Sequence, residues 1–355
     1  MHHREVPRLR RVSSSAPGFT RRRRGKGWQY FDTTGARITD PDVVARISSL
    51  AIPPAYTDVW ICPIANGHLQ AVGTDARGRR QYRYHPDWRV KQDQAKHERV
   101  LEVAAELPRA RAVVEEHLHL PGMPRERALA AAFRLLDLGF FRVGGESYAD
   151  ENGSYGLATL RREHVHQHGD DLVFSYVAKH GKDRRAVISD PAVRDVVRTL
   201  KRRHGGGDDL LAWREGRRWH DVTSTDVNAY LHETMGPDVS AKDFRTWHAT
   251  VLAAVALAVS LPAAGTATGR KRAVSRAVTE VSEYLGNTPA VCRKSYIDPR
   301  VIDLFEDGIT VEPALRDLGE DAAFGHPATH GAIEAAVQAL LREEPAALAR
   351  ARRAA

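Results

Sequence analysis

The sequence AVSRAVTEVSEYLGNTPAVCRKSYIDP, residues 273–299, contains two helix-forming segments with a glycine between them. Apolar residues recur at helical spacing through the first segment and predict an amphipathic helix. They are Val274, Ala277, Val278, Val281, Tyr284 and Leu285. Gly286 is typical of the residue that ends a helix, and Pro289 suits the first turn of a second one. The stretch therefore predicts two consecutive helices joined at Asn287.

Tyr296 is the residue of this stretch that suggests chemistry. It directly follows Arg293, Lys294 and Ser295. A tyrosine with its ordinary pKa of about 10 is a poor nucleophile at neutral pH, but nearby cations favour the phenolate. Tyr296 is therefore a candidate to attack a phosphodiester. The alternative, from this stretch alone, is a half-buried aromatic residue between two salt-bridged cations.

The positive charge of the chain is concentrated at its N-terminus. The formal net charge is +8. Residues 1–26 account for it, because they are rich in arginine and hold the single acid Glu5, whereas the rest of the chain is balanced. A basic segment on a neutral body favours an anionic polymer such as nucleic acid as partner. The alternative is a solvated tail without a specific partner.

Cysteine usage and hydropathy argue against several classes of protein. Cys62 and Cys292 cannot build a disulfide framework and form no C-x-x-C motif, so we expect a reducing, cytoplasmic compartment. The longest apolar run, residues 249–264, is too short and too rich in alanine for a membrane span and predicts a buried helix. The N-terminus lacks the apolar segment of a secretory signal. We therefore expect a soluble protein with no membrane partner.

Length and pattern predict an α+β protein of several domains. A chain of 355 residues is long enough for two or three cores. Alternating residues over 157–165, 172–178 and 184–188 predict a three-stranded antiparallel sheet within an otherwise helical domain. The expected divisions are a disordered basic arm (1–26), a small β-rich N-terminal domain (27–92), a mainly helical domain (93–305) and an acidic helical region packed on it (306–355).

Five residues at the ends of predicted elements have the chemistry that metal-free phosphoryl transfer needs. They are Arg142, Lys179, Arg245, Asn287 and Tyr296. The tyrosine supplies a nucleophile, the arginines hold the nonbridging phosphate oxygens, and the lysine can protonate the departing oxygen. Each also has a simpler interpretation: ion-paired arginines, solvated turn residues for Lys179 and the nearby Lys182, and a helix cap for Asn287.

The order of these five residues resembles the type IB DNA topoisomerases, in particular their small bacterial, poxvirus-like branch. The resemblance runs from about Trp28 to about Phe305. Its most specific segments are KDFRTW, YLGNTPAVCRKSYI, YGLATLRREHV and GRRQYRY. Together these segments are a strong signal, whereas each alone is weak.

The resemblance implies a mechanism. The two domains would clamp double-stranded DNA, and Tyr296 would form a 3′-phosphotyrosyl bond, leaving a free 5′-hydroxyl. Strand swivelling and religation would relax positive and negative supercoils without ATP, metal or another cofactor, in a monomer associated with the nucleoid. Arg142 and Arg245 would stabilise the transition state, and Lys179 would act as general acid. Asn287 departs from the histidine of many members, so its hydrogen bond to phosphate would not titrate.

Further DNA contacts follow from the same resemblance. The expected DNA-binding residues are Gln81, Tyr82, Tyr84, Tyr148 and Lys242. The run RRQYRY alternates, which places Tyr82 and Tyr84 on one face of a strand and Gln81 and Arg83 on the other.

Three other interpretations compete with this one. His164, His166 and His168 share a strand face and suggest a metal site, and the alternative is a solvated or backbone-bonded histidine face. A tyrosine recombinase would use similar residues, but Lys242 stands where those proteins usually have histidine. A DNA-compacting protein without enzymatic activity would need only the basic charge and would make no demand on Tyr296.

Overall fold

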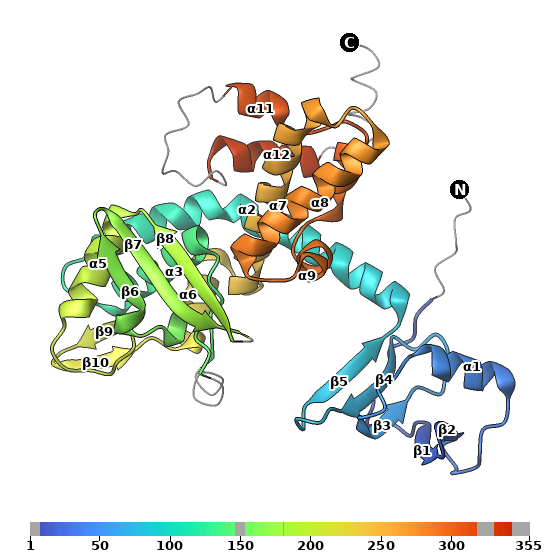
Figure 1. The fold of residues 1–355 in the computed structure, drawn as a ribbon. Helices are drawn as coiled ribbons and strands as arrows, with labels where there is room; N and C mark the ends of the chain where they lie inside the picture. Colours follow the sequence, from blue (N-terminus) through green and yellow to red (C-terminus); the bar gives the residue numbers. More distant parts are fainter. Residues whose placement is uncertain (1–7, 146–152, 180, 318–329, 343–355) are drawn as a thin grey trace. The chain divides into compact units, whose positions relative to one another are not determined.

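The computed structural model describes residues 8–145, 153–179, 181–317 and 330–342. The chain divides into two compact units, Met1–Lys96 and His97–Ala355. The first is the strand-rich unit and the second is mainly helical, so the predicted α+β class is confirmed (Figure 1).

The strand-rich unit contains two small antiparallel sheets. Its elements are β1 (Thr20–Arg24), β2 (Gly27–Phe31), α1 (Pro41–Ser49), β3 (Thr57–Ile61), β4 (Leu69–Thr74) and β5 (Arg80–Tyr84). Strands β1 and β2 form one sheet, and β3, β4 and β5 form the other in that order. Ile47, Ile61 and Ala71 form the buried centre of this unit. Of these strands, β5 alternates between exposed and half-buried residues, whereas the central strand β4 is buried on both faces.

The expected disordered arm is wrong at its C-terminal end, where Thr20–Arg24 forms β1. The Arg21 guanidinium lies over the Trp28 ring, with 3.9 Å from Cζ to the ring centroid. The same guanidinium donates hydrogen bonds to the carbonyls of Ile52, Pro53 and Tyr56. The sequence suggested a solvated tail because it does not reveal such partners, an aromatic ring and backbone carbonyls, for a run of arginines.

The helical unit is built around long helices. It takes up α2 (Pro86–Leu118) from residue 97 onward, and its other helices are α3 (Arg125–Gly139), α5 (Pro191–Arg202), α6 (Ser224–Met235), α7 (Ala241–Ser260), α8 (Ala267–Leu285), α9 (Pro289–Ser295), α10 (Pro299–Glu306), α11 (Glu312–Asp317) and α12 (Ala332–Arg342). Helix α2 contains Pro108 in its interior.

The predicted three-stranded antiparallel sheet is present, with one change. Its strands are β6 (Val165–His168), β7 (Asp171–Ala178) and β8 (Lys182–Ile188), in that order. The first strand starts later than expected, because two short 3-10 turns, Leu157–Thr159 and Arg162–His164, precede it. A second hairpin, β9 (Ala212–Glu215) with β10 (Arg218–Asp221), was not predicted.

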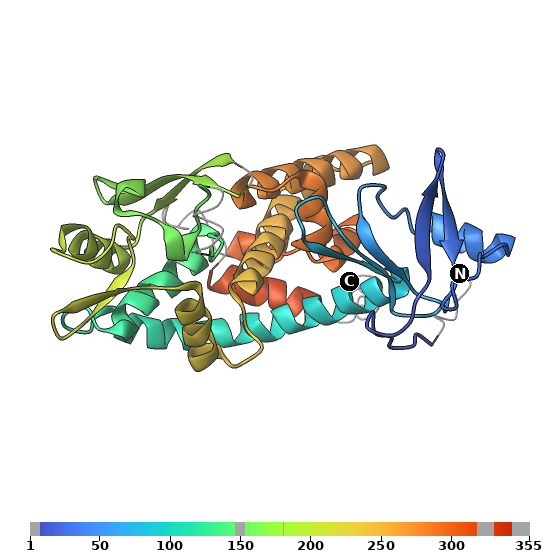
Figure 2. The same cartoon turned by 90° about the horizontal axis from the view of Figure 1, so that it is seen from below.

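Helix α7 forms the centre of the helical unit (Figure 2). It packs against α3, α8, α10, α11 and α12, and Trp247 and His248 are fully buried in it. By length and composition, residues 241–263 are apolar enough to cross a membrane, and 56% of the most apolar window is buried inside the protein. The predicted buried helix over 249–264 is thus the C-terminal half of this core helix.

The start of α7 is fixed by side-chain hydrogen bonds. Ser240 donates its backbone N–H and its hydroxyl to the Asp243 carboxylate, which is the reciprocal pattern of a capped helix. Arg99 on α2 donates to the other oxygen of Asp243 at 2.7 Å. These contacts fix the first turns of α7, and Arg245 lies there.

Helix α12 is tied to the core by one buried acid. Glu334 is 4% exposed. Its Oε1 accepts a hydrogen bond from the Trp247 indole at 2.7 Å, and its carboxylate pairs with Arg111 on α2. The C-terminal helix therefore contacts the two helices that hold the centre of the unit.

Glu334→Ala is expected to lower the free energy of unfolding by about 3–5 kcal/mol, because Arg111 and the Trp247 indole would lose a buried acceptor. Urea denaturation followed by tryptophan fluorescence measures the change. Glu334→Gln, which keeps an acceptor for Trp247, should cost less. A loss below about 1 kcal/mol for the alanine variant, typical of a surface substitution, would contradict this docking.

Candidate active site

Tyr296 is held at the end of a short helix by the chain features that the sequence predicted. Helix α8 ends at Gly286, whose φ of +61° is left-handed and whose N–H bonds to the Glu283 carbonyl. Thr288 then caps α9, and Pro289 occupies its first turn. Tyr296 follows the last turn of α9 and is half-buried. The helix–glycine–helix prediction is confirmed.

The backbone around Tyr296 is anchored to the core helix. The Thr250 hydroxyl on α7 accepts from the N–H of Asp298 at 3.1 Å, and its one hydrogen is shared between the carbonyls of Thr246 at 2.9 Å and Tyr296 at 3.3 Å. Because Thr250 and Arg245 lie on the same helix, α7 positions both the tyrosine and the arginine beside it.

Arg142 and Asn287 are brought together. Arg142 lies in the loop after α3, beyond Phe140, which takes a left-handed conformation with φ 55°. Its Nη2 donates to Asn287 Oδ1 at 2.6 Å. The amide nitrogen of Asn287, Nδ2, is buried and has no hydrogen-bond partner among the described residues. Arg142 therefore orients the Asn287 amide so that its donor remains available.

Arg245 packs against the nucleophile candidate. Its side chain donates to the carbonyls of Phe140 and Leu285, and its Cζ lies 5.3 Å from the centroid of the Tyr296 ring. Arg245 is 3% exposed, and burial, together with the charge of Arg142, lowers its pKa to about 10. The side chain therefore remains a cation at neutral pH, and its Nε is a second buried donor without a partner.

The cations around Tyr296 lower its pKa. Burial acts in the opposite direction and raises it, but the charge and hydrogen bond of Arg245, with the charges of Arg142 and Lys242, outweigh burial. The expectation that cations favour the phenolate therefore fits, but the cations differ from those expected. Arg293 and Lys294 are adjacent in sequence and exposed, since successive helical residues point in different directions.

Lys179 lies at the tip of the hairpin between β7 and β8 and is exposed. Within the described part of the chain, no hydrogen bond or ion pair links it to Tyr296 or the arginines. Lys182 is exposed as well, but it lies within β8. Lys182 pairs with Ala178, and Arg184 pairs with Tyr176, so Lys182 shares a face with Arg184.

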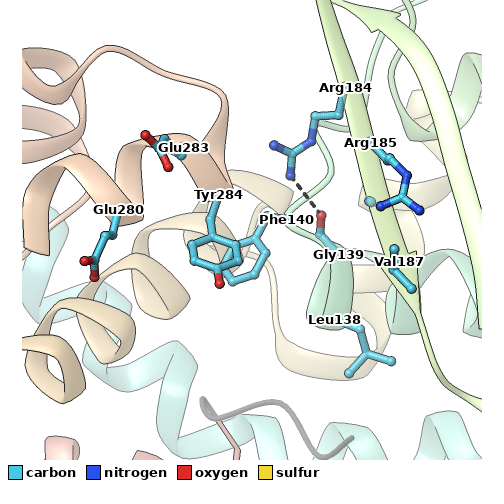
Figure 3. Close-up of a pocket in the computed structure, with 10 residues that line it drawn as sticks. Leu138, Gly139, Phe140, Arg184, Arg185, Val187, Glu280, Glu283 and Tyr284 are labelled. Atoms are coloured by element: carbon cyan, nitrogen blue, oxygen red, sulfur yellow. Dashed lines mark hydrogen bonds between the residues drawn. The ribbon is translucent and has the colours of Figure 1, made fainter. Parts of the chain in front are cut away.

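Sequence reasoning missed Arg184 and Tyr176. Arg184 donates to the Gly139 carbonyl at 3.2 Å (Figure 3). Tyr176 is buried, and Arg184 is its hydrogen-bond partner across the strand pair. The alternation of β8 could have indicated that Arg184 faces inward. Arg184 is half-buried, whereas its neighbours in the strand, Asp183 and Arg185, are exposed.

The predicted DNA-contact residues of β5 have the expected alternation. Tyr82 and Tyr84 are 46% and 38% exposed, and their rings stack with centroids 6.2 Å apart. Gln81 is engaged differently, because its amide donates to Asp75 at 3.0 Å. The hydrogen bonds of Arg79 to Asp75 lower the pKa of that carboxyl to about 2. The exposed feature of β5 is thus an aromatic pair.

The two remaining predicted contacts lie in the helical unit or outside the described residues. Lys242 is exposed in the first turn of α7, near enough to Tyr296 for its charge to lower the tyrosine pKa. Tyr148 falls outside the described residues, so its place as a DNA contact stays a prediction.

A possible metal-ligand set lies away from this site. Ligand atoms of Asp137, His248 and His330 lie within 4.8 Å of one another. However, Arg111 donates to both Asp137 oxygens, at 2.8 and 2.9 Å. Although burial opposes it, hydrogen bonds from the two histidines and Arg111 hold the pKa of Asp137 well below its usual range. The group fits a buried ion-pair network rather than a metal centre.

The three histidines that the sequence suggested as metal ligands differ in their surroundings. His164 lies just before β6, and its Nδ1 accepts a hydrogen bond from the backbone of Arg161 at 3.0 Å. His166 and His168 are exposed on β6.

Comparison with known proteins gives two family matches. Residues 85–310 match the family described as eukaryotic DNA topoisomerase I, catalytic core. Residues 27–75 match the bacterial DNA topoisomerase IB N-terminal domain. The first match covers the last residues of the strand-rich unit and most of the helical unit. The second match lies within the strand-rich unit.

Individual relatives agree with the family matches. The chain is 29% identical to DNA topoisomerase 1B of Acanthamoeba polyphaga mimivirus over 288 residues, which cover 79% of this chain and 84% of the relative. It is 22% identical to DNA topoisomerase 1B of vaccinia virus over 266 residues, 74% of this chain and 81% of the relative. A shorter match, 29% over 129 residues, is to DNA topoisomerase 1 of Daucus carota.

Proposed function

The chain belongs to the type IB DNA topoisomerases, a family of isomerases, and from this premise we propose that it relaxes positive and negative supercoils by transient cleavage of one strand. It acts on double-stranded DNA as a monomer in the cytoplasm, associated with the nucleoid and without a membrane partner. The reaction passes through a 3′-phosphotyrosyl intermediate and uses neither ATP nor metal.

The observation that carries this proposal is a set of donors without acceptors next to a tyrosine. Asn287 Nδ2 and Arg245 Nε are buried and have no partner among the described residues. Such groups are costly unless something fills the site. A phosphate offers acceptor oxygens and negative charge to both, and the lowered pKa of Tyr296 places a nucleophile beside them.

The proposed chemistry needs only these side chains and DNA. The Tyr296 phenolate attacks phosphorus, and the bond between phosphorus and the 5′-oxygen breaks. Arg142, Arg245 and Asn287 stabilise the charge of the pentacoordinate transition state. A lysine gives a proton to the departing 5′-oxygen. The ester retains the bond energy, so the 5′-hydroxyl can attack back and restore the strand and the free tyrosine.

The test of this function is relaxation of negatively and positively supercoiled plasmids in EDTA without ATP. Relaxation of both substrates is expected. A requirement for magnesium or ATP, or relaxation of negative supercoils alone, would contradict the proposal.

The strand register favours Lys182 over Lys179 as the lysine that protonates the 5′-oxygen. Lys182→Ala is expected to slow cleavage about 10²–10⁴-fold, the usual contribution of a general acid, and Lys179→Ala, its matched control on the same hairpin, much less. A substrate with sulfur in place of the 5′-bridging oxygen should restore cleavage in the impaired variant, because a thiolate leaves without a proton. Rescue of Lys179→Ala instead would return the role to Lys179.

A further inference from the structure

Arg184 reaches the site from the sheet, whereas the other arginines come from α7 and from the loop after α3. It lies on β8, next to Tyr176 on β7, and its Nη2 donates to the carbonyl of Gly139 at the end of α3. Figure 3 shows its guanidinium directed from the strand toward this helix end. The contact brings Arg184 to the loop that carries Arg142.

The guanidinium groups of Arg184 and Arg142 meet at the turn before Asn287. A Cβ atom placed on Gly286 would lie 3.4 Å from Arg184 Nη1 and 4.0 Å from Arg142 Nη1. Both side chains therefore end beside the turn that leads to Asn287, whose side-chain amide nitrogen has no partner among the described residues. Burial lowers the pKa of Arg184, and the nearby charge of Arg142 lowers it further. The position tolerates a third cation only at an electrostatic cost.

Among the described residues, no carboxylate pairs with these arginines to offset this cost. Within the described residues, Arg142, Arg184 and Arg245 form no ion pair with a carboxylate and donate instead to carbonyl, amide and tyrosine oxygens. Other half-buried arginines of the same unit do have acids, as Arg111 and Arg127 show. Like charges that share a site repel one another. An anion between the three guanidinium groups would remove the repulsion.

We propose that Arg184 is a further phosphate-binding residue of this site, and that it contacts a nonbridging oxygen of the phosphate that Tyr296 attacks. The inference rests on the proposed function. It assigns to β8 a direct role in the reaction, in addition to the lysine at the start of that strand. A phosphate ligand at this position also explains why Arg184 faces inward, between two exposed neighbours in β8.

Single-turnover cleavage of a duplex tests the proposal. Arg184→Ala is expected to slow cleavage about 10²-fold, the usual cost of removing one donor to transition-state charge, and Arg184→Lys less. Arg185→Ala is the matched control, because Arg185 is the next residue of β8 and is exposed on the other face. Its cleavage rate should remain within about twofold of the wild type.

A neutral substrate separates charge stabilisation from a structural role. When a methylphosphonate replaces the scissile phosphate, one nonbridging oxygen and its charge are gone. The penalty of Arg184→Ala should then fall to a few-fold or less. A penalty of equal size on both substrates would overturn the proposal, because it would show that Arg184 only holds Gly139 and Tyr176 in place.

Anion binding distinguishes a failure of this inference from a failure of the proposed function. If the wild type cleaves no DNA, the proposed function fails, and calorimetric titration with inorganic phosphate still examines Arg184. Weaker phosphate binding by Arg184→Ala than by Arg185→Ala supports Arg184 as an anion ligand. Equal affinities would refute it.

Discussion

Tyr296→Phe is expected to abolish relaxation while DNA binding remains close to that of the wild type. The substitution keeps the ring that packs beside Arg245 and removes only the oxygen that would attack phosphorus. Loss of a covalent nucleophile costs on the order of 10⁶-fold in turnover. Plasmid relaxation measures the activity, and fluorescence anisotropy of a labelled duplex measures binding.

Tyr284→Phe is the matched control for this experiment. Tyr284 lies in the same stretch, but it is 59% exposed on α8. Its variant should relax plasmid at the wild-type rate. If Tyr296→Phe also relaxed plasmid normally, Tyr296 would be a packed aromatic residue. A protein that only compacts DNA would give no relaxation with either variant or with the wild type.

Arg245→Ala is expected to have the second largest effect, a loss of about 10²–10³-fold in the cleavage rate. The side chain donates to the carbonyls of Phe140 and Leu285, and among the nearby charges its own lowers the pKa of Tyr296 most. Removing it would reduce the stabilisation of the transition state and would also make ionisation of Tyr296 less favourable. Single-turnover cleavage across a pH series measures both effects.

The pH profile of this variant has a defined direction. Cleavage requires the phenolate, so the rate rises with pH until Tyr296 is ionised. Arg245 lowers the pKa of Tyr296, so its removal must raise that pKa and move the rising limb of the profile to higher pH. Arg245→Lys, which keeps a charge, should shift the limb less. An unchanged limb in Arg245→Ala would show that Arg245 does not promote ionisation of Tyr296.

The sequence pattern within single elements predicted the helix ends that lead up to Tyr296. Gly286 and Pro289 predicted that one helix ends and a second begins there, and the structure has α8 and α9 at these places. The alternation of Tyr82 and Tyr84 was also readable, because a strand exposes every second residue. Both inferences need only the periodicity of one element.

Features that depend on pairing between distant segments were not readable from the sequence. The partners of Asn287 and Arg245 are Arg142 and two backbone carbonyls, which come from other elements. The side chain of Arg184 faces inward only because of the register with β7. For the same reason, Arg21 was counted as tail charge, although Trp28 and three carbonyls hold it.

The central claim is that Tyr296 becomes joined to the 3′ end of a cleaved DNA strand. A duplex labelled at the 5′ end of one strand is incubated with the protein in EDTA, denatured rapidly and digested with trypsin, and the adduct peptide is sequenced by mass spectrometry. The account predicts a 5′-labelled fragment linked through its 3′-phosphate to the peptide that contains Tyr296. Attachment at another residue, or to the 5′ end of the break, would contradict it.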